Sequence, residues 1–375
     1  MRLLVNGRFL TRAMTGVDRT ATEITRALIA MVPQRELEIA VAVPRGAPDD
    51  RIIRERLGLS ERSPIHRSVL RGYAWEQLVL ARLDPGAVLL SLCNMGPVLR
   101  RNQFALIHDA QVHDTPESYT RVFGTTYRML QPLLARRAQW LATVSRHSSE
   151  RLRANGIGAR RRIYLIPNGA DHFDRIRPDM TMLQRLGLEP GGYLFALASP
   201  AAHKNIPLLL RAAMRREGRD LPLVLAGAGD AESLLPEGSE AGDAIRFAGR
   251  IDDNELKALY QGARLFLFPS LTEGFGFPVL EAMSCGCPVI ASTGGAVPEV
   301  AGSAAMLVDP ADQAAWTQAM DYLQNNSDQL GALAAAGSRQ VGGFTWRHAA
   351  ELVLAALEPE AGPVGEGSGC EPAIA

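Results

Sequence analysis

The sequence predicts an α/β protein with two doubly wound parallel sheets that face each other across a cleft. Short apolar runs alternate with helical patterns along most of the chain, which is typical of parallel α/β layers. A length of 375 residues exceeds one ordinary core and favours two domains. Hydrophobic residues make up 47% of the chain and charged residues 21%, which is the composition of a folded protein and not of a disordered one.

The expected strands are the short apolar runs. They lie at residues 2–5, 39–44, 87–92, 104–108, 141–144 and 163–166 in the first half, and at 193–198, 223–226, 245–247, 265–268 and 289–291 in the second. Between them, helical spacing recurs, as in Val17, Ala21, Ile24, Leu28 and Met31, which share one face of a 3.6-residue period. The carboxyl ends of parallel strands meet at one edge of a sheet, so ligands are expected in the cleft between the two sheets.

The domain boundaries follow from the same pattern. Residues 1–173 are expected to form an N-terminal, Rossmann-like acceptor domain, and residues 191–345 a C-terminal nucleotide-sugar-binding domain, with a linker at 174–190. A helix at 346–358 is expected to pack back on the N-terminal domain. Residues 359–375 are rich in Gly, Pro and Glu, and a disordered tail is expected there.

The net charge of zero conceals two oppositely charged halves. Residues 1–170 contain 26 Lys and Arg against 14 Asp and Glu, a balance of +12, and the remaining residues carry −12. Either the basic half meets an anionic partner, such as a phospholipid surface or a phosphate-bearing acceptor, or its charges are spread over a solvated surface. No nucleic acid is expected as a partner, because no motif interleaves basic with aromatic residues.

The cysteines and the apolar runs bear on the compartment. Cys93, Cys285, Cys287 and Cys370 make no C-x-x-C pair and no metal spacing, so reduced thiols are expected. No apolar run reaches the roughly 18 residues of a membrane span, and the first residues are too short a run for a secretion signal. We therefore expect a cytoplasmic protein, peripheral on the inner face of the plasma membrane if its basic half binds lipid.

The tract with the most chemical information covers residues 268–286 and reads FPSLTEGFGFPVLEAMSCG. It is expected to leave a strand, pass through a glycine-rich turn and enter a short helix, with Pro278 at the first helical position. The backbone N–H groups of Gly274, Phe275 and Gly276 would then face an anion, aided by the helix dipole. A diphosphate fits this description.

Two glutamates belong to the same tract. Glu273 is expected in the loop and Glu281 in the helix, so both would reach one extended ligand and accept hydrogen bonds from vicinal hydroxyls of a sugar and a ribose. The alternative is a tight strand–helix turn with two solvated glutamates.

A second loop, residues 199–205 with the sequence SPAAHKN, follows an expected strand. The chain uses arginine 38 times but lysine only at Lys204 and Lys257, so a lysine here suggests a need for a compact charge. Stabilising a departing diphosphate is such a need. Ser199, His203 and Asn205 are expected to bind the same donor, whereas an ordinary helix-capping loop is the alternative.

Three further candidates rest on weaker patterns. The loop that holds Gly16 and Arg19 joins the first strand to the first helix, so Gly16 is expected at the donor and Arg19 at the acceptor, although a plain turn explains it nearly as well. His108 ends a strand and would donate a hydrogen bond to a sugar or position the acceptor, with a core histidine as the alternative. Asp109, which follows it, is expected to bind the acceptor. Arg250 follows another strand and is expected to flank the base.

Taken together and in this order, these motifs resemble the family-four retaining glycosyltransferases of the GT-B fold. The resemblance is carried by Gly16-Val17-Asp18-Arg19, His108-Asp109, Asn168-Gly169-Ala170-Asp171, His203-Lys204-Asn205, the tract from Glu273 to Glu281, and the tract from Pro288 to Glu299. It covers nearly everything from residue 1 to about residue 350 and is strong over residues 193–310. Bacterial mannosyltransferase-like members of surface-polysaccharide pathways are the most similar.

The resemblance implies transfer of a hexose, with mannose favoured, from a GDP-sugar or a UDP-sugar to a glycan or lipid-linked acceptor. It implies that Lys204 contacts the diphosphate, that Glu273 faces the hexose and Glu281 the ribose, and that His108 lies at the reacting sugar. It also implies retention of configuration by front-face attack, with a donor phosphate oxygen as the proton acceptor. These roles make His108, Lys204 and Glu273 the expected catalytic residues.

One departure from the family concerns the diphosphate. His203 stands where relatives often carry an arginine, so a permanent charge is lost. The resemblance then implies either that Arg19 or Arg250 compensates, or that the activity is slower.

No cofactor or metal is expected, because no Asp-x-Asp pair stands in a suitable loop. Three rival functions remain open at this stage: an epimerase or phosphorylase on the same two-domain plan, a non-catalytic sugar-nucleotide-binding subunit, and an NAD-dependent oxidoreductase. The candidate fingerprint of the last is Gly227-Ala228-Gly229, with Glu232 in the place of its third glycine.

Overall fold

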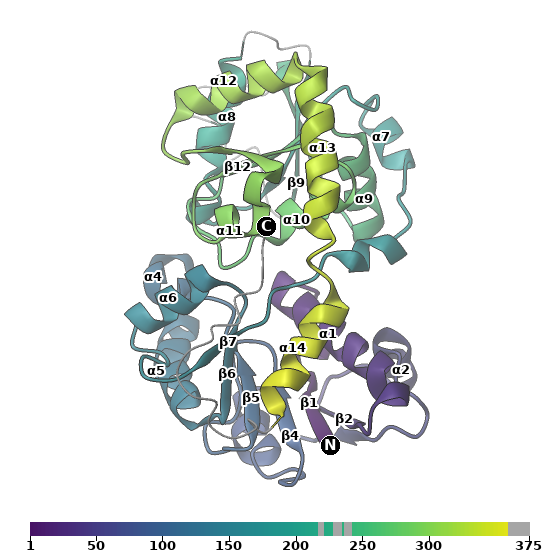
Figure 1. Ribbon diagram of the computed structural model, residues 1–375, viewed down its shortest axis with the longest axis vertical. Helices are drawn as coiled ribbons and strands as arrows, with labels where there is room; N and C mark the ends of the chain where they lie inside the picture. The colour runs from purple at the N-terminus through teal and green to yellow at the C-terminus, as the bar shows by residue number, and fades with distance from the viewer. Residues whose placement is uncertain (217–220, 228–234, 236–241, 359–375) are drawn as a thin grey trace, which may run out of the picture.

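The computed structural model describes residues 1–216, 221–227, 235 and 242–358. They form two domains stacked along the long axis of the molecule (Figure 1). Each domain is a parallel sheet with helices around it, which confirms the predicted fold class. The candidate fingerprint glycine Gly229 and the expected tail at 359–375 lie outside the described residues.

The N-terminal sheet has seven strands in the order β3-β2-β1-β4-β5-β6-β7. Their bounds are β1 Arg2–Asn6, β2 Glu38–Val43, β3 Ile65–Arg67, β4 Val88–Ser91, β5 Gln103–Leu106, β6 Trp140–Thr143 and β7 Ile163–Leu165. The reversal of strand order between β1 and β4 places a switch point there, where doubly wound sheets open a ligand crevice.

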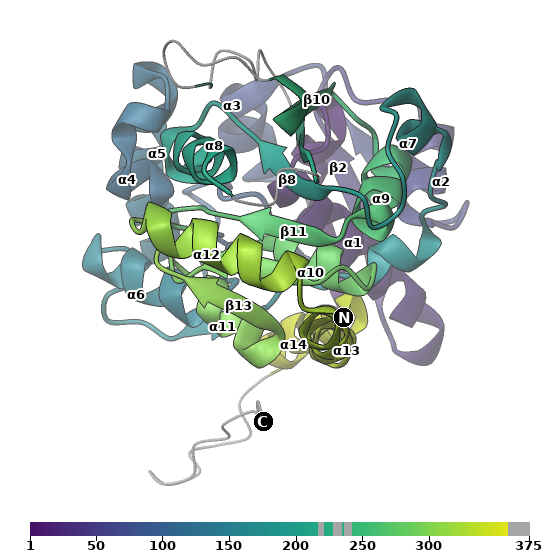
Figure 2. The same cartoon turned by 90° about the horizontal axis from the view of Figure 1, so that it is seen from above.

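The C-terminal sheet has six strands in the order β10-β9-β8-β11-β12-β13. Their bounds are β8 Leu194–Ala198, β9 Leu223–Gly227, β10 Ile245–Gly249, β11 Leu265–Phe268, β12 Val289–Ser292 and β13 Ala305–Val308. Alternate residues of these strands belong to two different apolar clusters, one on each face of the sheet, because successive side chains in a strand point to opposite faces. Figure 2 shows α8 and α12 on one side of this sheet and α9 and α10 toward the other.

The helices that cover the N-terminal sheet begin with α1, whose first turn carries a capping box between Thr15 and Asp18. Their bounds are α1 Gly16–Met31, α2 Asp50–Leu57, α3 Gly72–Ala74, α4 Gln111–Asp114, α5 Arg121–Arg137 and α6 Arg146–Ala154. The C-terminal domain contains α7 Thr181–Arg185, α8 Ile206–Met214, α9 Asp253–Gly262, α10 Phe277–Ser284, α11 Val297–Ala301, α12 Gln313–Gln324 and α13 Ser327–Val341.

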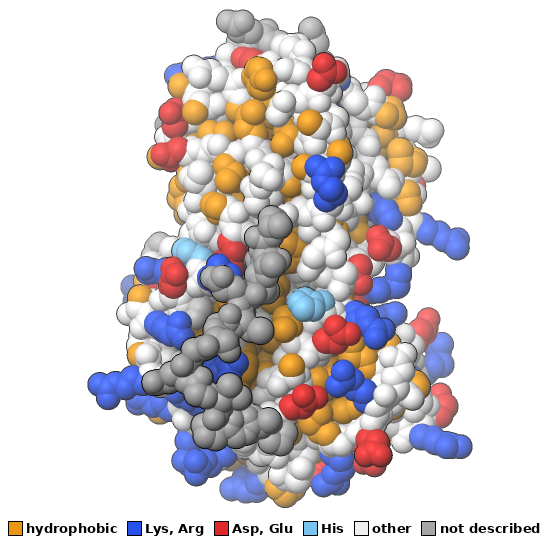
Figure 3. All heavy atoms as spheres, viewed as in Figure 1, with side chains coloured by type: hydrophobic (Ala, Val, Ile, Leu, Met, Phe, Trp, Pro, Cys, Tyr) orange, Lys and Arg blue, Asp and Glu red, His pale blue; other side chains and the backbone are white. Residues whose placement is uncertain are grey.

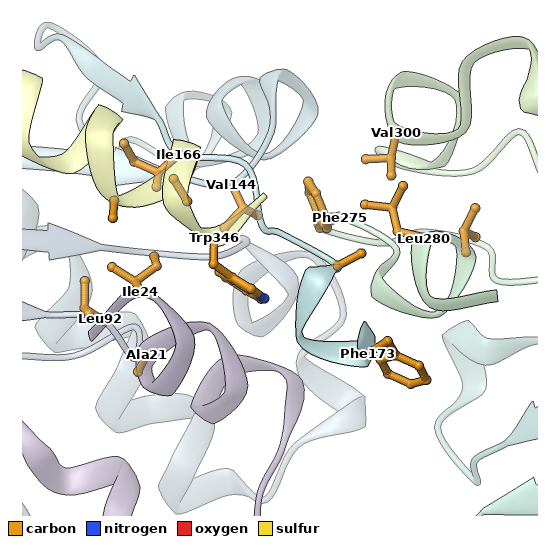
Figure 4. Close-up of a cluster of buried hydrophobic side chains, with 14 of the residues drawn as sticks. Ala21, Ile24, Leu92, Val144, Ile166, Phe173, Phe275, Leu280, Val300 and Trp346 are labelled. Atoms are coloured by element: carbon orange, nitrogen blue, oxygen red, sulfur yellow. The ribbon is translucent and has the colours of Figure 1, made fainter. Parts of the chain in front are cut away.

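The chain crosses between the domains twice. It first passes through the 3-10 turn η5 (Asp171–Arg175), and it returns ahead of α14 (Trp346–Leu357), which lies against α1 of the N-terminal domain (Figure 1). The crossings touch: a Cβ on Gly169 would lie 2.3 Å from the backbone nitrogen of Trp346, so only glycine fits there. Figure 4 shows Trp346 on the same side as Ile24, with Phe173 nearer the other domain. One apolar cluster thus runs through the junction.

Three sequence expectations differ from the observed elements. The strands β3 and β13, which both lie at sheet edges, were not predicted. The expected linker at 174–190 contains α7, which packs against α9, so its second part belongs to the C-terminal domain.

Candidate functional site

A cavity of about 570 Å³ lies between the domains, at the carboxyl ends of strands from both sheets. This volume is in the usual range of small-molecule sites. Eleven of the fourteen residues singled out from the sequence line it: Gly16, Arg19, His108, Asp109, His203, Lys204, Glu273, Gly274, Phe275, Gly276 and Glu281. The arrangement follows from the fold, since these residues lie in loops after strands or at helix starts.

The loop that joins β11 to α10 lines the cavity with backbone donors. Gly276 has a φ of +99°, a left-handed conformation that favours glycine, just before the Phe277-Pro278 start of α10. A Cβ on Gly274 would lie 2.7 Å from the Cβ of Asp109, so only glycine lets the loop approach the N-terminal domain this closely. Within the described residues, no protein group accepts a hydrogen bond from the N–H of residues 274–276. Free N–H groups at a helix start suit an anion.

An ion pair joins Lys204 to Glu273, with Nζ 2.7 Å from Oε1. Lys204 ends the short turn η6 (Ala202–Lys204) after β8, and its Nζ lies 5.6 Å from the ring centre of Phe268. The lysine side chain is 27% exposed, so its ammonium group remains in reach of a ligand in the cavity. The ion pair therefore holds the Lys204 ammonium group next to the glycine-bearing loop.

Glu281 lies beside His172 of the first chain crossing, which in turn contacts Trp346 of the second. His172 Nδ1 lies 3.1 Å from Trp346 Nε1, and because an indole N–H only donates, a neutral His172 ring carries its proton on Nε2. That Nε2 is buried without a hydrogen-bond partner in the described part of the chain and lies 3.4 Å from Glu281 Oε1. The Tyr260 hydroxyl donates to Oε2 of Glu281 at 3.4 Å. Sequence reasoning missed this arrangement, which orients a predicted ribose-binding carboxylate.

His108 is buried, and its ring contacts the backbone. Nε2 lies 2.9 Å from the carbonyl oxygen of Leu92, which can only accept, so Nε2 carries the proton and Nδ1 is the acceptor. Burial lowers the pKa of His108 to about 4, although the Leu92 contact and the charge of Asp18 oppose this shift. The expectation that His108 donates a hydrogen bond to a sugar is corrected here: the neutral ring offers Nδ1 as an acceptor.

Asp109 follows His108 and faces the other carboxylates of the site. Burial raises the pKa of Asp109 to about 6, and the negative charge of Glu273 acts in the same direction. The backbone N–H of Gln111 donates to Asp109 Oδ1 at 3.0 Å, which opposes the shift. A partly buried carboxyl group with a raised pKa beside a cavity is a typical feature of functional sites.

His203 does not supply the charge of the arginine that it replaces. Burial and the neighbouring Lys204 both lower the pKa of His203. Arg19 lines the cavity, and its Nη2 lies 2.7 and 2.6 Å from the two carboxylate oxygens of Asp253. Of the two arginines considered as a replacement, only Arg19 is in place to act.

Three residues that were expected to bind the donor do not line the cavity. Asn205 donates from Nδ2 to the carbonyl oxygens of Pro269 and Pro310 at 3.2 and 2.8 Å, and it has a φ of +56°. Ser199 accepts a backbone N–H within the same loop, so both side chains shape the lysine loop itself. Arg250 is exposed and follows the edge strand β10, away from the central strands that lead into the cavity.

Helix α6 begins at the cleft and bonds to the opposite domain. The hydroxyl groups of Ser145 and Ser148 donate to the carbonyl oxygen of Gly274 at 2.6 and 2.9 Å. The carboxylate of Glu299 accepts from the backbone N–H groups of Arg146 and His147 at 2.9 to 3.3 Å, and so caps α6 from across the cleft. These contacts hold the cleft closed over the glycine-bearing loop. Local sequence patterns do not reveal them, because the partners are far apart in the chain.

A second cavity of about 350 Å³ lies in the N-terminal domain beside the first. The two cavities share the lining residues Thr15, Val17, Asp109 and Gln111. Its aromatic wall is built by Tyr119, Phe123 and Tyr127, whose stacked rings have centroids 5.6 and 4.2 Å apart. The sequence did not predict this cavity.

No group of three or more His, Cys, Asp and Glu side chains in the part of the chain that the structure describes is arranged to hold a metal ion. None of the helices there combines the length and the apolar character that spanning a bilayer requires.

Residues 192–326 match the family model described as "Glycosyl transferases group 1". Two solved structures share the fold over nearly their whole length. Sucrose-phosphate synthase from Thermosynechococcus elongatus has a TM-score of 0.70 at 19% identity, covering 94% of this chain and 97% of that one. The Anabaena protein HepE, solved with UDP and glucose, has a TM-score of 0.68 at 16% identity, covering 95% and 99%. At these identities the likeness establishes the two-domain fold.

The curated relatives include several mannosyltransferases. The O-antigen chain mannosyltransferase B of Escherichia coli is 37% identical over 178 residues, which cover 45% of this chain and 46% of that protein. The O-antigen chain mannosyltransferase RfbU of Salmonella typhimurium is 26% identical, with 62% and 64% covered. Both matches therefore span less than two thirds of those relatives.

The family of this chain is shown by a relative that matches over a longer stretch. The MMP alpha-(1->4)-mannosyltransferase of Mycolicibacterium hassiacum is 30% identical over 289 residues, which cover 73% of this chain and 68% of that protein. With this relative matched over more than two thirds of its length, and with the cavity built on the motifs of the C-terminal domain, the chain belongs to the group 1 glycosyl transferase family.

Proposed function

We propose that this protein is a retaining, metal-independent hexosyltransferase. It moves a hexose, with mannose favoured, from a nucleoside-diphosphate sugar to a glycan or lipid-linked acceptor in surface-polysaccharide synthesis in the cytoplasm. The observation that carries the proposal is that Lys204, Glu273, Glu281 and the loop 274–276 line one interdomain cavity. The mannosyltransferases among the relatives support mannose as the transferred sugar. HepE was solved with UDP and glucose, so a UDP-sugar is the alternative donor.

The donor's diphosphate is assigned to the glycine-bearing loop and Lys204. The free backbone N–H groups, the start of α10 and the lysine ammonium all offer positive potential at one place. Charge builds up on the diphosphate as the sugar leaves, so these groups stabilise the transition state more than the bound donor. Donor phosphate would displace Glu273 from Lys204 and free that carboxylate for the sugar hydroxyls.

The acceptor is assigned to the second cavity. That cavity meets the first at Asp109 and Gln111, so a hydroxyl group held there would face the sugar of the donor. Nδ1 of His108 accepts a hydrogen bond from the reacting sugar, and Asp109 orients the attacking hydroxyl group. The anomeric configuration is retained if the acceptor hydroxyl group attacks from the side of the leaving diphosphate. An oxygen of that diphosphate then takes the proton of the hydroxyl group.

A thermal-shift panel of GDP- and UDP-sugars without added metal tests the donor class. We expect the largest shift with GDP-mannose and expect EDTA to leave it unchanged. Lys204→Ala and Glu273→Ala should each lower turnover by about 10²-fold, by analogy with the loss of an oxyanion donor, while the fold is kept. Arg211→Ala, which removes an exposed charge of α8 outside the cavity, is the matched control. Near-normal turnover in either cavity variant would refute these roles.

The pKa of His203 supports one second candidate, a non-catalytic sugar-nucleotide-binding subunit. Its lowered pKa leaves Lys204 as the one cation of the lysine loop. Such a subunit would give a thermal shift with a nucleotide sugar but no transfer to any acceptor. A catalyst gives both.

A further inference from the structure

Helix α5 exposes a narrow apolar stripe on its outer face. Val122 is 80% exposed, Met129 65% and Leu133 44%. Their spacing of seven and four residues keeps them on one side of the helix. A single exposed apolar residue is ordinary, but an aligned set on one helix indicates a surface that contacts something apolar.

Arginines border this stripe. The 17-residue helix contains no acidic residue, and its exposed arginines are Arg121, Arg128, Arg136 and Arg137. The helix dipole accounts for the two in the last turn, but not for the other two or for the apolar stripe between them. Figure 1 places α5 at the outer edge of the N-terminal domain, and Figure 3 shows Lys and Arg side chains on both sides of that domain.

The inner face of the same helix belongs to the second cavity. Phe123, Tyr127 and Gln131 of α5 line it. A helix with its side chains is about 10 Å across, so anything bound to the outer face of α5 lies about one helix width from the cavity.

We propose that the outer face of α5, defined by Val122, Met129, Leu133 and the four arginines, docks on an anionic lipid bilayer, and that the acceptor enters the second cavity while its lipid anchor stays in that bilayer. The inference rests on the proposed glycosyl transfer and selects the lipid-linked acceptor over a soluble glycan. An apolar stripe with a cationic rim is the pattern of helices that lie in a membrane interface. Guanidinium groups pair with lipid phosphates, and the +12 balance of residues 1–170 attracts the same surface.

Co-sedimentation of the full chain with vesicles tests the docking. We expect binding to phosphatidylcholine vesicles that contain phosphatidylglycerol, and little binding to phosphatidylcholine alone. The triple variant Val122→Ser/Met129→Ser/Leu133→Ser should lose about 10-fold in vesicle binding. The double variant Arg121→Gln/Arg128→Gln should show a weaker preference for the anionic vesicles, since Arg136 and Arg137 remain.

The matched control is Ile52→Ser/Val69→Ser/Leu78→Ser, which changes three exposed apolar residues of the same domain outside α5 and should bind as the parent does. Circular dichroism verifies that each variant is folded. Equal vesicle binding by the α5 triple variant and the parent would overturn the proposal. The proposal would also be overturned if the parent bound to immobilised polyglutamate but not to vesicles, because that result indicates an acidic protein as the partner.

Activity separates this inference from the proposed function. The α5 triple variant should transfer sugar to a soluble glycan at the parent's rate and lose transfer to a lipid-linked glycan in vesicles. If it transfers to both at the parent's rate, docking through α5 is refuted and the glycosyltransferase assignment stands. If the parent binds vesicles through α5 but transfers nothing, the proposed function fails and the membrane surface stands.

Discussion

Replacement of Asp109 by asparagine is expected to stabilise the protein at neutral pH and to leave its stability unchanged in acid. Burial raises the pKa of Asp109 from 3.8 to about 6. Below the lower value the carboxyl group is protonated in the folded and unfolded chains alike. Between the two values only the unfolded chain releases the proton, so the parent loses stability as the pH rises through this window. Asparagine does not ionise and avoids the loss.

The size of the effect follows from the two pKa values. Their difference of about 2.2, at 1.36 kcal/mol per pKa unit, corresponds to about 3 kcal/mol at pH 7. Asp109 remains partly open to the cavity, and water there solvates the carboxylate, so this figure is an upper bound. Asparagine keeps the Oδ1 acceptor for the N–H of Gln111, which lies 3.0 Å away, and no cap is lost.

Urea unfolding of parent and variant between about pH 4 and pH 7 measures this difference. His108 has the opposite effect on the pH dependence of stability. Its pKa is lowered to about 4, so its contribution to the stability of the folded chain is present above about pH 6.5 and is lost as the pH falls toward 4. Both proteins contain His108, so subtraction isolates Asp109. Asp174→Asn, at an exposed position, should change stability by less than about 0.5 kcal/mol. A variant no more stable than the parent at pH 7, or a difference that stays constant with pH, would refute the reasoning.

Three further substitutions test the geometry of the cleft. His172→Phe removes the Nε2–H that faces Glu281, so the donor KM should rise about 10-fold while kcat changes little, as steady-state kinetics would show; an equal fall in kcat would contradict a positioning role. Glu299→Gln weakens the cap on α6, and kcat/KM should fall about 10-fold, the equivalent of one charged hydrogen bond; unchanged kinetics would show that this contact is dispensable. Gly274→Ala places a Cβ 2.7 Å from that of Asp109, so the cleft should not close and turnover should fall about 10²-fold at an unchanged melting temperature; full activity would mean that closure does not need this approach.

The sequence predicted the strands well where burial produces a clear apolar run. All eleven expected strands occur, and the two that were missed lie at sheet edges. β3 (Ile65–Arg67) has the sequence IHR, and its residues are at most half-buried, so no hydrophobic period marks it. Edge position alone does not explain the omissions, because β7 and β10 are also edge strands and both were predicted.

The sequence also identified most of the loops that line the cavity, because loops after parallel strands meet at one edge of the sheet whatever the details of packing. It did not predict which polar side chains in those loops face a ligand. Asn205 and Lys204 are adjacent, yet the amide fastens the loop to two prolyl carbonyl groups while the amine faces the cavity. That choice depends on the left-handed φ of Asn205, which residue types alone do not reveal.

Contacts between the domains were beyond sequence reasoning for a different reason. Glu299 belongs to a tract that resembles the family, but its partners are backbone N–H groups of α6, which any residue supplies. The His172–Trp346 pair likewise depends on two crossings of the chain meeting at one point. Local periodicity contains no information about either.

The opposite charges of the two halves give the proposed docking a direction. An anionic bilayer attracts residues 1–170, with a balance of +12, and repels the remainder, with −12, so the chain approaches with its N-terminal domain foremost. At physiological salt the Debye length is about 8 Å, so once the protein is bound only charges near the surface contribute, and the arginines of α5 are placed there. Raising the salt concentration should therefore weaken vesicle binding of the parent but leave the part that depends on Val122, Met129 and Leu133, because burial of apolar side chains is not screened.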